Sequence, residues 1–183
     1  MSVPDSVRLA MPAEAVDIAR IQRRAWGRNP ATRAVLEKVP ADEMARSWHE
    51  AIVKPPLAHF RVMVALGQGQ IVGFAVMGPS PDDDAELRTG HVAEFIVDQD
   101  ASAEDHSGRL INAAVDTLRK DGYETATMWI PSDSDELRAF LLECGWGTDG
   151  AHQEVGTDDG STVIKLVRLH TDIREDSAAP TPA

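Results

Sequence analysis

The segment "FIVDQDASAEDHSGR", residues 95–109, could do the most specific chemistry, because an apolar stretch there runs directly into an amphipathic one. A strand that leads into a helix N-terminus commonly binds phosphate, since the free amides and the helix dipole favour an anion. Such turns are usually rich in glycine and basic residues. This one instead carries four acidic residues: Asp98, Asp100, Glu104 and Asp105.

The spacing Ser102-x-x-Asp105 is close to a capping box, in which a serine accepts hydrogen bonds from first-turn amides. We therefore expect Ser102 to cap the helix, with Glu104 and Asp105 in the first turn, where the dipole stabilises carboxylates. A phosphate docking there would meet like charge. A helix that satisfies its own N-terminus and a phosphate cradle both remain open interpretations.

A calcium loop is a third interpretation, because oxygen-bearing side chains recur at alternate positions of this segment. The glycine expected at the sixth position is missing, and Arg109 stands where a bidentate glutamate belongs. Asp98, Asp100 and His106 could bind another metal, but a solvated loop explains them better. We therefore predict no metal site.

The composition predicts an acidic globular protein of 183 residues with 43% apolar residues and a formal net charge of −12. This charge argues against nucleic acid and anionic membranes as partners, and it is compatible with a cationic substrate. A single cysteine, Cys144, together with the absence of a signal-peptide pattern or membrane-length apolar run, predicts a cytoplasmic protein. We expect one domain over residues 1–173 and a disordered tail over 174–183.

Hydrophobic periodicity predicts strands and helices in the order β-α-α-β-β-β-α-β-α-β-β. We expect a mixed α/β (α+β) fold, with a central mixed sheet of six to seven strands and about four helices on both faces. Expected strands are residues 7–10, 59–66, 71–78, 91–98, 124–130, 152–157 and 161–169, and expected helices are 13–26, 41–52, 107–122 and 134–145. The segment "GRNP" is expected to end the first helix. Four arginines in and just after the first helix are expected to form a solvated helix face: Arg20, Arg23, Arg24 and Arg28.

This order resembles that of the GNAT N-acetyltransferase superfamily. Four segments carry the resemblance over roughly Val7 to His170: "QIVGFAVMG", "AEFIVD" with "GRLINAAVDTLRKDGY", "LRAFLLECGWGTDG" and "IKLVRLH". The resemblance implies a GNAT-like fold that uses acetyl-CoA as co-substrate. It also implies a homodimer as one assembly, because GNAT proteins often dimerise.

The resemblance further implies that the fourth and fifth strands splay apart, and that the backbone of the fourth pairs with the pantetheine arm of acetyl-CoA. In this sequence that backbone is Phe95, Ile96 and Val97. The family's turn reads Arg/Gln-x-x-Gly-x-Gly/Ala, and the matching positions Ser102, Asp105 and Ser107 depart from it. The remaining pyrophosphate donors are expected to be Ser107, Gly108 and Arg109.

The family's frequent glutamate base falls on His91 in this sequence, and histidine is a suitable base near neutral pH. Glu94 is the second candidate, although it lies on the opposite face of a regular strand unless a bulge intervenes. The family's tyrosine proton donor falls on Leu141. Tyr123 is expected to pack, and Cys144 is either a weak donor or inert.

The substrate is expected to enter beside the first two helices, where Trp26 and Trp48 either frame an amine or pack the helices together. The resemblance implies acyl transfer from acetyl-CoA to a primary amine of a small molecule or protein, by direct attack. The loss of the family's basic residue, of its glycines and of its tyrosine keeps a second hypothesis open. In it, the chain is a catalytically degenerate GNAT-fold module that binds a ligand or a protein partner.

Overall fold

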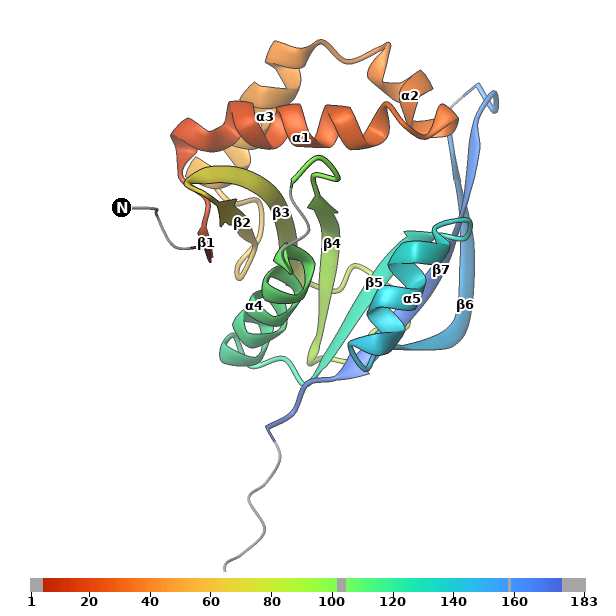
Figure 1. The fold of residues 1–183 in the computed structure, drawn as a ribbon. Coiled ribbons are helices and arrows are strands. Elements are labelled where there is room, and N and C mark those ends of the chain that lie inside the picture. The colour runs from red at the N-terminus through yellow and green to blue at the C-terminus, as the bar shows by residue number, and fades with distance from the viewer. Residues whose placement is uncertain (1–4, 102–104, 158, 176–183) are drawn as a thin grey trace, which may run out of the picture.

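The computed structural model describes residues 5–101, 105–157 and 159–175 and contains one mixed sheet. Its seven strands run in the order β1-β2-β3-β4-β5-β7-β6 (Figure 1). The strands are β1 (Ser6–Leu9), β2 (Arg61–Gly67), β3 (Gln70–Pro79), β4 (Thr89–Val97), β5 (Thr125–Pro131), β6 (Gly147–Gly156) and β7 (Val163–Asp172). Among the strands of the described residues, only β4 and β5 pair in parallel. The mixed sheet predicted from the sequence is confirmed.

Five α-helices and one 3₁₀ turn accompany the sheet in the described part of the chain. They are η1 (Pro12–Glu14), α1 (Ala15–Trp26), α2 (Pro30–Leu36), α3 (Ala41–Val53), α4 (His106–Lys120) and α5 (Asp135–Glu143). The sequence predicts no helix at α2, because Asn29-Pro30 is also a typical helix end. Asn29 instead caps a new helix by accepting from the Ala31 amide at 2.9 Å, and Pro30 occupies the first helical position, where it costs no hydrogen bond.

The helices cover both faces of the sheet. On one face, Ile18 and Ile21 of α1 pack with Val64, Phe74 and Val76 of β2 and β3. The other face is covered by α4 and α5, whose fully buried residues include Leu110, Leu118 and Leu141. In Figure 1, α1 to α3 lie above the sheet, whereas α4 and α5 lie in front of it.

Glycines end two of these helices as the sequence predicts. Gly122 and Gly145 have φ values of +92° and +86°, which glycine adopts without steric cost. After each glycine, the next amide returns to the helix: Tyr123 donates to the Leu118 carbonyl, and Trp146 donates to the Leu141 carbonyl. These caps direct the chain from α4 into β5 and from α5 into β6.

No helix in the described ranges is both long and apolar enough to span a membrane.

The packing of Phe74 makes a prediction about stability. Phe74 is 0% exposed and its ring meets Trp48 of α3 edge-on, with 5.3 Å between centroids. Phe74→Ala should lower the free energy of unfolding by about 3–5 kcal/mol, because it leaves a cavity between the sheet and the helices. Leu142→Ala, at a residue 48% exposed, is the control and should change it by no more than about 0.5 kcal/mol. Urea denaturation measures both, and a loss below about 1 kcal/mol for Phe74→Ala would contradict this packing.

Candidate active site

The parallel ladder between β4 and β5 is short. It joins Thr89–Val92 to Thr125–Met128 and then stops, although β4 continues to Val97 and β5 to Pro131. Beyond that point β4 stays paired with β3, and β5 stays paired with β7. The two strands diverge toward their C-terminal ends in Figure 1. The β5-facing edge of residues 93–97 therefore has no strand partner, and its backbone groups can bind an extended ligand.

A β-bulge in β4 decides which side chains flank this edge. Glu94 pairs with Val76 and Val92 pairs with Met77, so Ala93 is the extra residue. Paired residues of neighbouring strands share a face, and His91, which pairs with Gly78, therefore lies on the same face as Glu94. This is the face that α1 covers through Val76. In a regular strand, Glu94 and His91 would lie on opposite faces. Because of the bulge, both candidate bases can belong to one site.

Glu94 is a half-buried carboxylate that has no hydrogen-bond or ion-pair partner among the described residues. Removal of water by the surrounding atoms raises the pKa of Glu94 to about 7. Near neutral pH this side chain therefore exists in both protonation states. Such a pKa suits a general base, because a large fraction of the side chain is ionised at neutral pH and the ionised form still binds a proton well.

His91 is 8% exposed and its Nδ1 lies 2.9 Å from the Thr127 hydroxyl of β5. That hydroxyl donates to the Gly90 carbonyl at 3.3 Å, so the imidazole N–H is assigned to Nδ1, which donates to Thr127. Burial lowers the pKa of His91, as does the charge of Arg168, while Asp82 opposes both. A neutral imidazole follows, and within the described chain its Nε2 makes no hydrogen bond.

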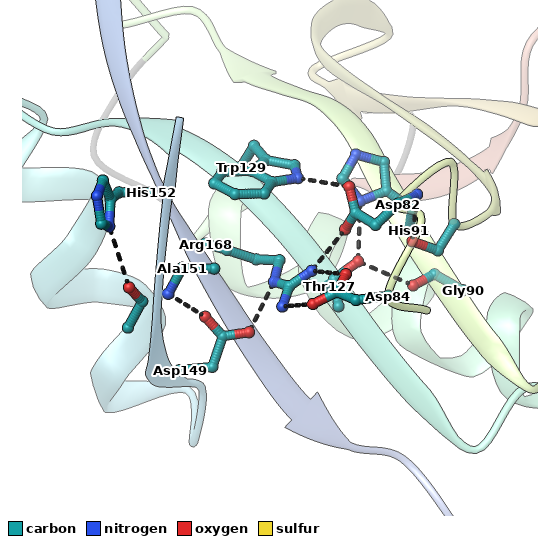
Figure 2. A network of polar contacts seen from close by, with 12 residues as sticks. Asp82, Asp84, Gly90, His91, Thr127, Trp129, Asp149, Ala151, His152 and Arg168 are labelled. Carbon is teal, nitrogen blue, oxygen red and sulfur yellow. Dashed lines mark hydrogen bonds and ion pairs between the residues drawn. The ribbon is translucent and has the colours of Figure 1, made fainter. Parts of the chain in front are cut away.

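Next to His91 lies a polar network centred on Arg168 of β7 (Figure 2). The Arg168 guanidinium reaches Asp82 at 3.0 Å, Asp84 at 2.7 Å and Asp149 at 2.6 Å, and it lies 5.4 Å from the Trp129 ring centre. These contacts raise the pKa of Arg168 and lower that of Asp84. The network fixes the loop after β3 against β5 and β7, and it brings together more negative than positive charge.

The N-terminus of α4 differs from the sequence prediction. The helix begins at His106 with Asp105 as its N-cap, so Asp105 does not lie in the first turn. Its Oδ1 accepts from the Gly108 amide at 2.8 Å, and a Cβ on Gly108 would collide with this carboxylate. The predicted cap Ser102, together with Glu104, lies outside the described residues. The chain therefore places its own anion on one of the amides predicted to bind pyrophosphate.

Arg109, the predicted basic donor at this helix, also has partners. It reaches Asp5 at 3.1 Å and His106 Nδ1 at 2.7 Å. The side chain of Ser107 makes no hydrogen bond or ion pair with the described residues, and its amide is one that a helix start leaves without an intrahelical partner. Within the described part of the chain, Ser107 is therefore the one of the three predicted pyrophosphate residues whose donors have no other partner.

The turn after β4 carries less net charge than its sequence suggests. Arg24 binds Asp98 at 2.7 Å and Asp100 at 3.1 Å, and Arg28 lies 3.6 Å from Asp100. Arg24 and Arg28 are exposed, as the sequence predicts, whereas Arg23 is partly buried and donates to the Val39 carbonyl at 2.8 Å. Arg24 of α1 and Arg28, which follows that helix, offset two of the acidic residues, and they tie the segment after β4 to the C-terminal end of α1.

The other predicted residues take packing positions. Trp48 donates to the Gln22 side chain at 2.8 Å while contacting Phe74, and Trp26 packs in the cluster formed by α1, α2 and α3. A substrate role for either tryptophan stays a prediction. The Phe95 ring stacks on Phe140 of α5 at 6.1 Å, so Phe95 can offer a ligand only its backbone at this edge.

The position of the family's tyrosine donor is buried. Leu141 is 0% exposed in the core, and Tyr123 packs beside Gly90 and His59. Burial, with the carboxylates of Asp105 and Glu143, raises the pKa of the Cys144 thiol, which therefore stays protonated at neutral pH. Within the described residues no group of three or more His, Cys, Asp and Glu could hold a metal ion.

Sequence reasoning missed three features of this site: the cap of Asp105 on Gly108, the contact of Thr127 with His91, and the network around Arg168. The first had a local signal, because aspartate is a preferred N-cap residue and accepts from the amide three positions further on. The other two join residues 19 or more positions apart. Their partners could not be read from local pattern.

Comparison with known proteins places this geometry in a family. The family model described as "Acetyltransferase (GNAT) family" matches residues 17–146, which is more than half of the chain. The chain belongs to the GNAT family of acetyltransferases. The family predicted from the sequence is thereby confirmed.

Solved structures show the same fold at low sequence identity. A putative acetyltransferase, yncA, from Salmonella typhimurium, solved with its cofactor acetyl-CoA, has a TM-score of 0.71 and 19% identity, covering 99% of this chain and 100% of that one. A ribosomal-protein-alanine N-acetyltransferase from Brucella melitensis has a TM-score of 0.69 and 17% identity, covering 91% and 98%. The PaiA N-acetyltransferase from Thermoplasma acidophilum, in complex with coenzyme A, has a TM-score of 0.67 and 10% identity, covering 93% and 99%. No curated protein matched the sequence.

The raised pKa of Glu94 makes a prediction about stability and pH. A carboxyl whose folded pKa lies above its unfolded value of 4.5 binds protons more tightly when folded, so its contribution to stability is lost as pH rises from 4.5 to about 7. Glu94→Gln removes this loss. The variant should gain about 1–3 kcal/mol relative to wild type between pH 5 and pH 8, measured by urea denaturation. A difference between the two proteins that does not change with pH would contradict the desolvation of Glu94.

Proposed function

We propose that this protein transfers an acetyl or other acyl group from acetyl-CoA to a primary amine, by direct attack of the amine. The observation that carries the proposal is the unpaired edge of β4 beyond Val92, with Glu94 beside it. Acetyl-CoA supplies an activated thioester. The backbone of Phe95, Ile96 and Val97 would hold its pantetheine arm through the hydrogen-bonding groups that β5 leaves unpaired.

The residues of the chain account for the proton on the amine. An amine is protonated near neutral pH and attacks only as the free base. Glu94, with a pKa near 7, takes the proton from the ammonium group when it is ionised. The free Nε2 of His91 offers a second acceptor on the same face. The leaving thiolate would take a proton from water or from the protonated thiol of Cys144, since Leu141 replaces the family's tyrosine.

The pyrophosphate end of the co-substrate fits less well. Asp105 covers the Gly108 amide, and Arg109 is held by Asp5 and His106. Ser107 and the nearby Arg24 and Arg28 remain as donors, provided that the arginines release Asp98 and Asp100. The same cap is the observation that favours the second candidate, a catalytically degenerate module that binds a ligand or a protein partner.

The charge on Asp105 separates the two candidates. Asp105→Asn keeps a side-chain cap and removes the negative charge. Its affinity for acetyl-CoA, measured by calorimetry, should be about tenfold or more higher than that of wild type. The reason is that one like-charge pair, between the Asp105 carboxylate and a phosphate bound at the same helix N-terminus, costs on the order of 1–3 kcal/mol. Asp116→Asn, on the exposed side of α4, is the matched control and should have no effect.

Wild-type binding in the micromolar range would favour the enzyme. Absence of binding in the wild type that is recovered in Asp105→Asn would favour the module blocked by its own cap. Absence of binding in both proteins would remove acetyl-CoA as the co-substrate.

The role of Glu94 predicts a pH profile. In wild type, kcat/KM for acetylation of an amine should rise with pH through about 7, because the base form of Glu94 accumulates over this range. Glu94→Gln should lower the rate by about 10²–10⁴-fold and abolish this rise. Glu154→Gln, which removes a carboxylate from the exposed strand β6, should leave both unchanged. An unaltered profile in Glu94→Gln would assign the base to another residue.

A further inference from the structure

A side-chain hydrogen bond joins β4 to β5 just before the two strands separate. The Nδ1 atom of His91 lies 2.9 Å from the Thr127 hydroxyl, and these two residues are opposite one another in the parallel ladder. One further pair, Val92 and Met128, follows before the ladder ends. The bond therefore lies at the start of the unpaired β4 edge, on the face that also carries Glu94.

The surroundings of this bond decide which atom donates. Both side chains are buried, with exposures of 8% for His91 and 5% for Thr127, so water does not compete for the contact. The Thr127 hydroxyl has one proton, and the Gly90 carbonyl, which can only accept, lies 3.3 Å from it. Because the hydroxyl donates to Gly90, it accepts from His91, and the imidazole proton lies on Nδ1.

This arrangement leaves the lone pair of Nε2 free. In the described part of the chain, Nε2 of His91 has no hydrogen-bond partner, yet it is not one of the unpaired polar atoms that are closed off from solvent. The hydrogen bond made by one ring nitrogen of a histidine sets the protonation of the other. In free histidine the proton favours Nε2, so Thr127 selects the less common form. In this form the solvent-accessible nitrogen can accept a proton.

The position of His91 relative to Glu94 places two proton acceptors side by side. Ala93 is the extra residue of the bulge, so the two side chains are spaced like residues i and i+2 of a regular strand, about 6–7 Å apart. Burial lowers the pKa of His91, which Asp82 opposes and Arg168 reinforces, so the ring is neutral near neutral pH. An ammonium group bound beside Glu94 can therefore also reach a neutral acceptor on His91.

We propose that Thr127 is a positioning residue for acyl transfer, which holds the proton of His91 on Nδ1 so that Nε2 serves as a second base beside Glu94. This role rests on the proposed acyltransferase function. In the step, an N–H bond of the ammonium group breaks, its proton moves to the lone pair of Nε2, and the freed amine attacks the thioester carbonyl. The resulting imidazolium keeps its Nδ1–H bond to Thr127 and later releases the Nε2 proton to solvent.

The tautomer of His91 tests the proposal without an assay of activity. Nitrogen NMR of the full chain, recorded above neutral pH, distinguishes a ring nitrogen that carries a proton from one that does not. His91→Gln assigns the signals among the six histidines. The wild type should carry the proton on Nδ1. A proton on Nε2 would show that Thr127 donates to the ring and would overturn the proposal.

Substitutions of Thr127 separate this role from packing. Thr127→Val keeps the branched shape and removes the hydroxyl, so the form of His91 with its proton on Nε2 should become the major one. Thr127→Ser keeps the hydroxyl and should keep the proton on Nδ1. Thr125→Val, two residues earlier on the same face of β5, is the matched control and should leave the tautomer unchanged. An unchanged tautomer in Thr127→Val would overturn the role of the hydroxyl.

Rates in the Glu94→Gln background test the second base, because His91 is there the remaining acceptor. Adding Thr127→Val to Glu94→Gln should lower the residual kcat/KM for acetylation by at least about tenfold, whereas adding Thr127→Ser or Thr125→Val should change it by no more than about twofold. Equal losses with valine and serine at position 127 would indicate packing alone. That result, or no loss with either, would overturn the proposal.

The two measurements keep this inference apart from the proposed function. Acetyl transfer by a wild type whose His91 carries its proton on Nε2 would keep the acyltransferase and overturn the positioning by Thr127. Absence of transfer from acetyl-CoA to any amine would remove the acyltransferase function, and with it the base role of His91, even if the proton lies on Nδ1.

Discussion

The site depends on one constraint: β4 and β5 can pair in parallel for only four residues each. β4 remains bonded to β3 as far as Val97, and β5 remains bonded to β7 as far as Pro131, so the two halves of the sheet pull apart after Val92 and Met128. The bulge at Ala93 falls directly at the point of separation. It turns Glu94 onto the face of His91, and the separation leaves the neighbouring backbone edge free. One interruption of the sheet therefore supplies both a binding edge and a candidate base.

The acidic side chains around this site differ in what they contact. Asp98 and Asp100 are paired with Arg24 of α1 and with Arg28, which follows α1, and these contacts fix the segment after β4. Asp105 caps α4 and competes with any phosphate. Glu94 has no partner among the described residues and desolvation raises its pKa to about 7, whereas Arg168 lowers the pKa of Asp84. The net charge of −12 is thus compatible with binding an anionic co-substrate at one edge and a cationic acceptor at another.

Most of the fold could be predicted from the sequence, because periodic apolar residues and glycine caps such as Gly122 and Gly145 are local signals. The helix α2 was missed because Asn29-Pro30 ends one helix and starts another with the same two residues. Within the site, the sequence predicts that Glu94 shares a face with His91 only if β4 contains a bulge. The bulge is present at Ala93, but no residue type in the sequence marks its position. The partners of Arg24, Arg28 and Arg168 could not be predicted either, since ion pairs between distant segments depend on the assembled sheet.

Amide hydrogen exchange with and without saturating acetyl-CoA tests the central claim, that the unpaired edge of β4 binds the thioester arm. The account predicts slower exchange within residues 93–97 when acetyl-CoA is added, with no change in β1 and β2, because the ligand supplies the hydrogen-bond partners that β5 does not. Unchanged exchange in residues 93–97 at a concentration where calorimetry shows acetyl-CoA bound would contradict it. The co-substrate would then bind elsewhere, and the separation of β4 from β5 would have no part in acyl transfer.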